Sequence, residues 1–232
     1  WGNCCQRNYD IEYDISAPYL ALSSQLGNIT LDLSVRHDSG TATGSYAGAV
    51  QSSVDMNRDG VISKPEESVS SIDNANASPV NYDWSYTSYS LGANYQVNDN
   101  LASFVRLSRG GRANADRLAF GKINADGSVA SADAVDLVDQ LELGVKFRQD
   151  SFSVFATAFA AETEEQNFEA TSQTFFDRVY EAYGVEVESS YFIGDFDFRG
   201  NLTWTDAEIT QDALNPSVVG NTPRRQADLV YS

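Results

Sequence analysis

The chain has 232 residues, enough for one all-β domain with a sizeable core. It carries 33 acidic and 15 basic residues, a formal net charge of −18. This balance excludes nucleic acid as an expected partner, because no basic stripe is present to offset phosphate charge. Mean hydropathy is −0.34 and no run of about 18 apolar residues occurs, which excludes a transmembrane helix.

The N-terminal segment is predicted to be irregular. The chain starts at Trp1 without a basic and apolar leader, which indicates a processed chain or a piece of a longer one. Residues 1–17 are expected to be the end of a long loop. The adjacent Cys4 and Cys5 leave three alternatives open: a strained bridge between neighbours, pairing outside this chain, or two unbridged thiols.

Alternating apolar and polar residues predict about nine antiparallel strands from residue 18 onward. In 29–36, for example, Ile29, Leu31 and Leu33 alternate with polar residues, so one strand face is apolar and the other is polar. The predicted strands lie near residues 18–26, 29–37, 80–97, 101–112, 137–149, 152–162, 179–193, 196–208 and 223–232.

The connections between these strands alternate in length. Short turns are predicted at Gly27–Asn28, Asn98–Asn100, Gln149–Asp150 and Gly194–Asp195. Long polar loops are predicted over 38–80, 113–136, 162–180 and 209–222. An up-and-down meander with short turns at one end and long loops at the other is typical of a transmembrane β-barrel. Nine strands do not close a barrel of this kind, so we expect strands to be missing on both sides. The alternative is a large soluble antiparallel sheet with one wet face.

The first long loop contains the sharpest chemical motif of the chain. Residues 55–66 match the twelve-residue EF-hand calcium loop, in which hard oxygen ligands recur at fixed positions around the ion. Gly60 permits the sharp turn that this loop needs. The alternative is an acidic surface turn. We expect structural Ca²⁺ that stiffens an extracellular loop, with these ligands: Asp55, Asn57, Asp59, the carbonyl of Val61, Ser63 and Glu66.

Other polar groups carry weaker signals. The segment Asn124–Gly127 lacks a closing Glu and is predicted to be only a turn. His37 is the single histidine and is expected at the end of its strand. With no Cys–His pairing in the sequence, a nucleophilic triad is not expected, and we predict no enzyme.

Several stretches resemble TonB-dependent outer-membrane receptors over residues 80–232. The segment Tyr89–Arg112 is similar to the strand–turn–strand that ends in the SRG-R run of that family, and Val138–Phe147 is similar to its E-x-G-x-K strand. Tyr183–Glu188 and Gly200–Glu208 resemble the next hairpin, and Thr222–Gln226 resembles the start of the following strand. The order and spacing of these motifs carry the resemblance.

The resemblance implies a 22-stranded barrel around a plug domain in the outer membrane of a Gram-negative bacterium. It implies active uptake of a scarce nutrient, a siderophore-bound iron, cobalamin or an oligosaccharide, energised by TonB. The expected partners are outer-membrane lipid, the plug domain, the remaining barrel strands, TonB and the nutrient. In such a barrel, Arg106, Arg109 and Arg112 would suit either an anionic ligand such as an iron chelate or salt bridges between the wall and the plug. The plug and the TonB-binding segment are absent from residues 1–232. A secreted, calcium-stabilised β-sandwich that binds a surface polymer is the alternative.

Overall fold

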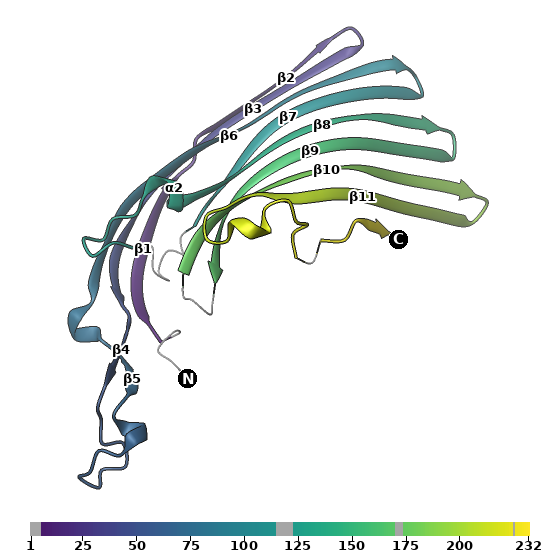
Figure 1. Cartoon of the computed structure of the whole chain (residues 1–232). Helices are drawn as coiled ribbons and strands as arrows, with labels where there is room; N and C mark the ends of the chain where they lie inside the picture. Colours follow the sequence, from purple (N-terminus) through teal and green to yellow (C-terminus); the bar gives the residue numbers. More distant parts are fainter. Residues whose placement is uncertain (1–5, 115–122, 170–173, 225) are drawn as a thin grey trace.

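The computed structural model describes residues 6–114, 123–169, 174–224 and 226–232. Its main feature is one curved antiparallel sheet of ten strands, in the order β1-β3-β6-β7-β8-β9-β10-β11-β12, with β2 also paired to β3 (Figure 1). The strands are β1 (Asn8–Ser16), β2 (Tyr19–Leu26), β3 (Ile29–Ala47), β6 (Ser78–Asn98), β7 (Leu101–Ala113), β8 (Val135–Gln149), β9 (Phe152–Glu169), β10 (Thr174–Ile193), β11 (Phe196–Asp212) and β12 (Leu229–Tyr231).

The sheet is open rather than closed into a barrel. Its order runs from β1 and β2 at one edge to β12 at the other, and these edges do not pair with each other in the described residues. The predicted all-β antiparallel meander is confirmed. No helix in the described residues combines enough length and apolarity to cross a bilayer.

Residues 8–26 form one strand that is interrupted at Pro18. Ser16 pairs with Ser39 and Tyr19 pairs with Arg36, so β1 and β2 keep a single register along β3. Proline has no amide hydrogen to donate, but the Pro18 carbonyl still accepts a 3.0 Å hydrogen bond from the His37 amide. The prediction of a loop over residues 1–17 is therefore wrong for 8–16. The signal was present, because Tyr9, Ile11, Tyr13 and Ile15 alternate with acidic residues.

The short turns lie where the sequence predicted them, at one end of the sheet (Figure 1). The long connections contain more strand than predicted. The first part of the predicted loop 38–80 belongs to β3, which runs to Ala47. The rest of this connection contains a projecting hairpin formed by β4 (Ala49–Ser52) and β5 (Val69–Ile72). The predicted loop 162–180 is shortened by β9 and β10. Backbone pairing extends these strands past the apolar alternation, because hydrogen bonds between strands do not depend on side-chain polarity. The predicted last strand, 223–232, forms only as β12.

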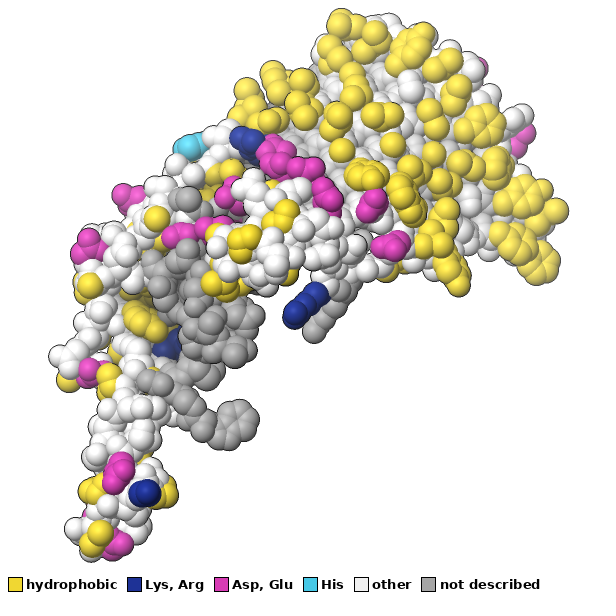
Figure 2. Space-filling view, in the orientation of Figure 1, with side chains coloured by type: hydrophobic (Ala, Val, Ile, Leu, Met, Phe, Trp, Pro, Cys, Tyr) yellow, Lys and Arg dark blue, Asp and Glu magenta, His cyan; other side chains and the backbone are white. Residues whose placement is uncertain are grey.

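The two faces of the sheet differ in chemistry. The apolar face carries Leu33, Leu91, Leu107 and Leu141, which are successive cross-strand neighbours and are all at least 40% exposed. Figure 2 shows hydrophobic side chains gathered over the part of the sheet near the short turns. The opposite face, which we call the polar face, carries charged and amide side chains. An exposed apolar band of this extent on a β-sheet is typical of a lipid-facing wall.

A small hydrophobic core lies on the polar-face side, toward the long loops. The buried residues Val80, Tyr82 and Trp84 of β6 pack with Ala42 of β3 and Ala134 of the short helix α2 (Ser131–Ala134). Helix α2 belongs to the connection before β8, which folds back over the sheet (Figure 1). The described loops contain three single 3₁₀ turns: η1 (Lys64–Glu66), η2 (Asn74–Asn76) and η3 (Pro216–Val218).

Candidate functional site

The three arginines of β7 are each engaged by an acidic residue of β8. Antiparallel pairing sets Arg106 opposite Glu142, Arg109 opposite Asp139 and Arg112 opposite Asp136. The ion-pair distances from guanidinium nitrogen to carboxylate oxygen are 3.8, 2.5 and 2.6 Å, in that order. In the sequence, basic residues recur at every third position of β7 and acidic residues at every third position of β8. This matched spacing could have predicted the row of three ion pairs.

These arginines do not form one anion-binding cluster. A spacing of three in a regular strand places Arg106 and Arg109 on opposite faces of the sheet. Arg109 shares the apolar face with Leu107, and Asp139 binds it through both guanidinium nitrogens Nε and Nη2 at 2.7 and 2.5 Å. The pairing therefore favours a role of these arginines within the wall over a joint role in binding one anionic ligand.

A row of charged side chains marks where the apolar band ends toward the long loops. On the apolar face, the row continues from Arg109 and Asp139 through the cross-strand neighbours Glu162, Glu181 and Glu208. Figure 2 shows acidic side chains in a line along the border of the hydrophobic area. Charges of this kind are costly in hydrocarbon, so the row indicates the outer limit of the lipid-facing band.

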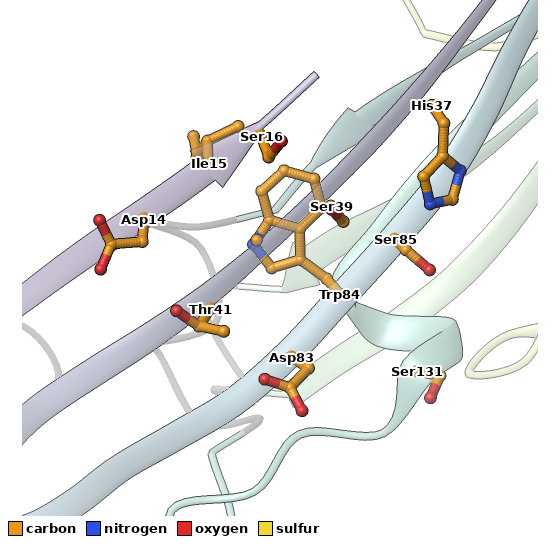
Figure 3. Close-up of a pocket in the computed structure, with 11 residues that line it drawn as sticks. Asp14, Ile15, Ser16, His37, Ser39, Thr41, Asp83, Trp84, Ser85 and Ser131 are labelled. Carbon is orange, nitrogen blue, oxygen red and sulfur yellow. The ribbon is translucent and has the colours of Figure 1, made fainter. Parts of the chain in front are cut away.

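Beyond this limit, strands β1, β3 and β6 share a polar groove of about 730 Å³. Its lining includes hydroxyl groups of Ser39 and Ser85 and the carboxylate of Asp83 (Figure 3). Strand β3 continues to Ala47, so His37 lies within it rather than at its end. The imidazole Nδ1 of His37 lies 3.0 Å from the Thr87 hydroxyl oxygen. Trp84 also borders the groove. Its indole nitrogen is buried without a hydrogen-bond partner among the described residues.

Aromatic rings on the polar face lie against glycines of neighbouring strands. An added Cβ at Gly144 would lie 2.6 Å from the Phe104 ring, and one at Gly184 would lie 2.6 Å from the Phe159 ring. The same arrangement joins Trp84 to Gly40. The absence of a side chain at these positions lets the rings approach the sheet, which packs the wall on the side where the polar groups face.

The predicted calcium loop lies at the end of the projecting β4–β5 hairpin. Its two ends are joined, because the Val54 amide donates to the Glu66 carbonyl at 3.0 Å. Gly60 adopts φ +85°, as the sharp turn of such a loop requires, and Arg58 adopts φ +61°. The backbone therefore has the reversal that the sequence predicted.

The acidic side chains of this loop point into it and accept hydrogen bonds from its backbone. Asp55 accepts from the amides of Asp59 and Gly60 at 3.2 and 2.8 Å. Glu66 is only 6% exposed and accepts from the Met56 amide and from the Ser63 hydroxyl at 2.9 and 2.6 Å. The Ser63 hydrogen bonds lower the pKa of Glu66 to about 2. Within the described parts of the chain, no three His, Cys, Asp or Glu side chains are gathered as a metal site.

Two further sequence predictions have different outcomes. The segment Asn124–Gly127 is a turn, closed by a 2.9 Å hydrogen bond from the Gly127 amide to the Asn124 carbonyl. Ser128 donates to Asp126 in this turn and lowers the pKa of its carboxyl. Cys4 and Cys5 lie outside the described residues.

Comparison with known proteins identifies the family to which this fold belongs. The family model for TonB dependent receptor-like β-barrels matches residues 1–232. The ferric yersiniabactin uptake receptor FyuA of Yersinia pestis is similar in structure, with a TM-score of 0.67 and 15% identity over 97% of this chain and 31% of that protein. The siderophore receptor PiuA of Acinetobacter baumannii gives a TM-score of 0.64 and 13% identity over 96% of this chain and 31% of its own.

A third similar structure is the ferric-catecholate import receptor Fiu of Escherichia coli K12, with a TM-score of 0.62 and 15% identity over 88% of this chain and 29% of that one. This chain thus spans about a third of the length of these structures. No curated protein sequence matches it. The chain belongs to the TonB-dependent receptor β-barrel family, whose barrels lie in the outer membrane of Gram-negative bacteria.

Proposed function

We propose that this chain is a segment of the barrel wall of an outer-membrane receptor that imports a ferric siderophore with energy from TonB. The observation that carries the proposal is the family match over residues 1–232. The exposed apolar band and the sorted connection lengths support a lipid-spanning wall. In this proposal the complete receptor adds the remaining barrel strands, a plug domain and the segment that contacts TonB. Cobalamin and oligosaccharides are the competing nutrients.

The barrel part of the proposal is tested by gel mobility of the native polypeptide in the outer-membrane fraction. A closed barrel resists SDS until it is boiled, so the unboiled band is expected to shift on heating and to exceed 25.3 kDa in size. A soluble species of about 25.3 kDa without a shift contradicts the proposal and favours the secreted β-sandwich.

The nutrient is tested by uptake in iron-starved cells. Deletion of the receptor gene is expected to abolish uptake of one radiolabelled ferric siderophore, and an intact copy restores it only when TonB is present. Labelled cobalamin and a labelled oligosaccharide serve as matched substrates in the same strains. Loss of uptake of either of these, with siderophore uptake unchanged, contradicts the siderophore assignment.

We also propose that residues 55–66 bind Ca²⁺ and thereby stiffen the β4–β5 hairpin. Asp55, Asn57, Asp59, Ser63 and Glu66 would supply side-chain oxygens and Val61 its carbonyl, a hard oxygen set that suits this ion. The support is the complete motif spacing, together with a loop in which Gly60 makes the turn and the carboxylates of Asp55 and Glu66 face inward. Extracellular calcium modules bind at roughly 10⁻⁴–10⁻³ M, which is the affinity expected here.

Titration calorimetry of the full receptor with CaCl₂ tests the calcium proposal. The double variant Asp55→Asn/Asp59→Asn keeps the shape of both side chains but removes two charges, and it is expected to abolish the binding heat. Asp126→Asn changes an acidic turn elsewhere and is the matched control, expected to bind as the wild type does. Equal binding heats in all three proteins would contradict a site at residues 55–66.

A further inference from the structure

The polar groove shared by β1, β3 and β6 lies on the same face of the sheet as the apolar band. Ser39 follows Leu33 in β3 by an even number of residues, so both side chains project from one face. Val35 of β3 is level with the charged row, because Tyr89 pairs with it on one side and with Arg109 on the other. Ser39 is four residues further along β3, so at about 3.3 Å per residue it lies roughly 13 Å beyond the outer limit of the band.

Two rows of polar side chains form this surface. Antiparallel register places three serine hydroxyls side by side across the three strands: Ser16, Ser39 and Ser85. Two residues along each strand, the same register forms a second row: Asp14, Thr41 and Asp83. All six residues line the groove, and Figure 3 shows the two rows on neighbouring strands. The surface is therefore a grid of four hydroxyl groups and two carboxylates.

The polar groups of the grid do not satisfy one another. Within the described parts of the chain, no side chain of either row takes part in a hydrogen bond or an ion pair. Other carboxylates of the wall are engaged, as Asp38 is by Arg36 and Asp139 is by Arg109. The hydrogen-bonding capacity of the grid is therefore available to a ligand.

The arrangement selects a neutral ligand that is rich in hydroxyl groups. Among the described residues that line the groove, none is lysine or arginine, so the groove lacks the cations that bind phosphate. Asp14 and Asp83 flank β3 at two strand spacings, about 10 Å, which is too far for both to bind one metal ion. Two hydrogen bonds of about 2.7 Å to these carboxylates leave roughly 4–5 Å between the donor oxygens of the ligand. Hydroxyl oxygens on opposite sides of one sugar ring have this separation.

The groove is preformed by packing behind it and beside it. Gly40 lies in β3 between the two rows, and an added Cβ there would lie 2.6 Å from the Trp84 ring, which is only 7% exposed. Ser131 of α2 lines the groove on the β6 side, where the Gly127 carbonyl accepts a 2.8 Å hydrogen bond from the Asn81 amide and fastens this connection to β6. A preformed floor and wall reduce the entropic cost of ordering a bound ligand.

We propose that this groove binds a sugar of the lipopolysaccharide in the outer leaflet of the membrane. The grid selects a sugar over a phosphate, and the position selects a lipid-linked sugar over a soluble one. The groove lies on the lipid-facing side of the wall and just beyond the apolar band, so the saccharide of a neighbouring lipid reaches it from the membrane. The inference rests on the proposed barrel wall and is independent of the nutrient, which passes on the opposite side of the sheet.

The test is titration of the full receptor, purified in detergent and freed of lipid, with lipopolysaccharide, followed by native mass spectrometry. Asp14→Ala/Asp83→Ala is expected to weaken binding about tenfold or more, because two hydrogen bonds to charged groups are lost. Asp10→Ala/Glu67→Ala removes two exposed carboxylates outside the groove and is the matched control, expected to bind as the wild type does.

A second variant and two further probes separate sugar recognition from other causes. Ser39→Ala/Ser85→Ala keeps both charges and is expected to weaken binding about fivefold, through the loss of two neutral hydrogen bonds. Dephosphorylated lipopolysaccharide is expected to bind the wild type as the intact form does. The free core oligosaccharide is expected to bind more weakly, because it lacks the lipid anchor. Heat-modifiable mobility is measured for every protein.

The inference is overturned if both groove variants bind as the wild type does while all proteins keep the heat shift, and the proposed function then still stands. It is also overturned if binding requires phosphate, or if the free oligosaccharide binds as tightly as the lipid-linked form. A wild-type receptor without a heat shift would contradict the barrel wall itself, and this inference with it, so the two failures are distinguishable.

Discussion

At the scale of single residues, glycine determines how closely the wall packs. At Gly144, an added Cβ would lie 2.5 Å from the Ala156 carbonyl oxygen and 2.6 Å from the Phe104 ring. Real Cβ atoms do not approach backbone atoms so closely, so either the strand or the ring has to move. Gly110 differs, because a Cβ added there would meet no atom of the surrounding described structure within 4 Å.

Alanine at either glycine reduces the freedom of the unfolded backbone, but only at Gly144 does the added methyl group meet neighbouring atoms. Comparing the two variants therefore separates the effect of packing on stability from the effect of backbone entropy. Gly144→Ala is expected to destabilise the barrel by about 1–3 kcal/mol through overpacking, whereas Gly110→Ala changes the stability by less than about 0.5 kcal/mol. The temperature at which the unboiled band loses its heat-modifiable mobility measures this difference. Equal transition temperatures for the two variants would show that the Phe104 contact does not limit the packing.

Glu66 predicts a pH dependence of the projecting hairpin. The pKa of Glu66 is lowered from 4.5 to about 2 in the folded loop, chiefly by hydrogen bonds from Ser63. A depressed pKa means that the ionised form stabilises the loop above pH 4.5 and that this contribution is lost as the pH falls toward 2. Hydrogen exchange at the Met56 and Asn57 amides, corrected for intrinsic rates and measured without calcium, is therefore expected to accelerate over this window. Glu66→Gln should remove the dependence, and an unchanged pH profile in that variant would assign it to another group.

At the scale of elements, the pairing of β7 with β8 forms a ladder, that is, a row of three ion pairs between the arginines of β7 and the acidic residues of β8. The arginine and acidic residues recur at the same spacing, and antiparallel register brings them opposite one another. The sequence alone placed the arginines but left their partners open, because the partners are separated by a long connection. Only the register determines that Asp139 faces Arg109.

A double-mutant cycle tests the strongest step of this ladder. Arg109→Ala and Asp139→Ala are expected to show a coupling energy of about 0.5–1 kcal/mol, since the pair is bidentate but partly exposed. Arg106→Ala with Glu142→Ala is the matched cycle and is expected to couple less, because that pair is 3.8 Å apart. Denaturant unfolding in detergent provides the stabilities. A coupling at Arg106 equal to that at Arg109 would contradict the geometric ranking.

At the scale of the whole molecule, the exposed apolar face is expected to contact lipid, because exposing so much apolar surface to water is unfavourable. Leu143 of β8 is 53% exposed on this face, whereas Gln140 of the same strand lies on the polar face. Leu143→Arg is expected to cost about 2–4 kcal/mol of stability in a bilayer, the range for a charge at its midplane. Gln140→Arg, the matched control, is expected to cost much less. Folding into lipid vesicles of the full receptor measures both, and a tolerated Leu143→Arg would contradict the membrane-facing assignment.

The sequence by itself determined the all-β meander, the short-turn positions, the apolar parity and the turn at Gly60, because each depends on residues that are close in the chain. It did not determine where the strands end, and it missed β1 although the alternation of Tyr9 and Ile11 was present. Only the tertiary structure decided which charges meet, since cross-strand register joins residues far apart in sequence. The same register places Lys146 beside the Phe104 ring and Arg148 beside the Phe155 ring, because it sets these strands next to each other.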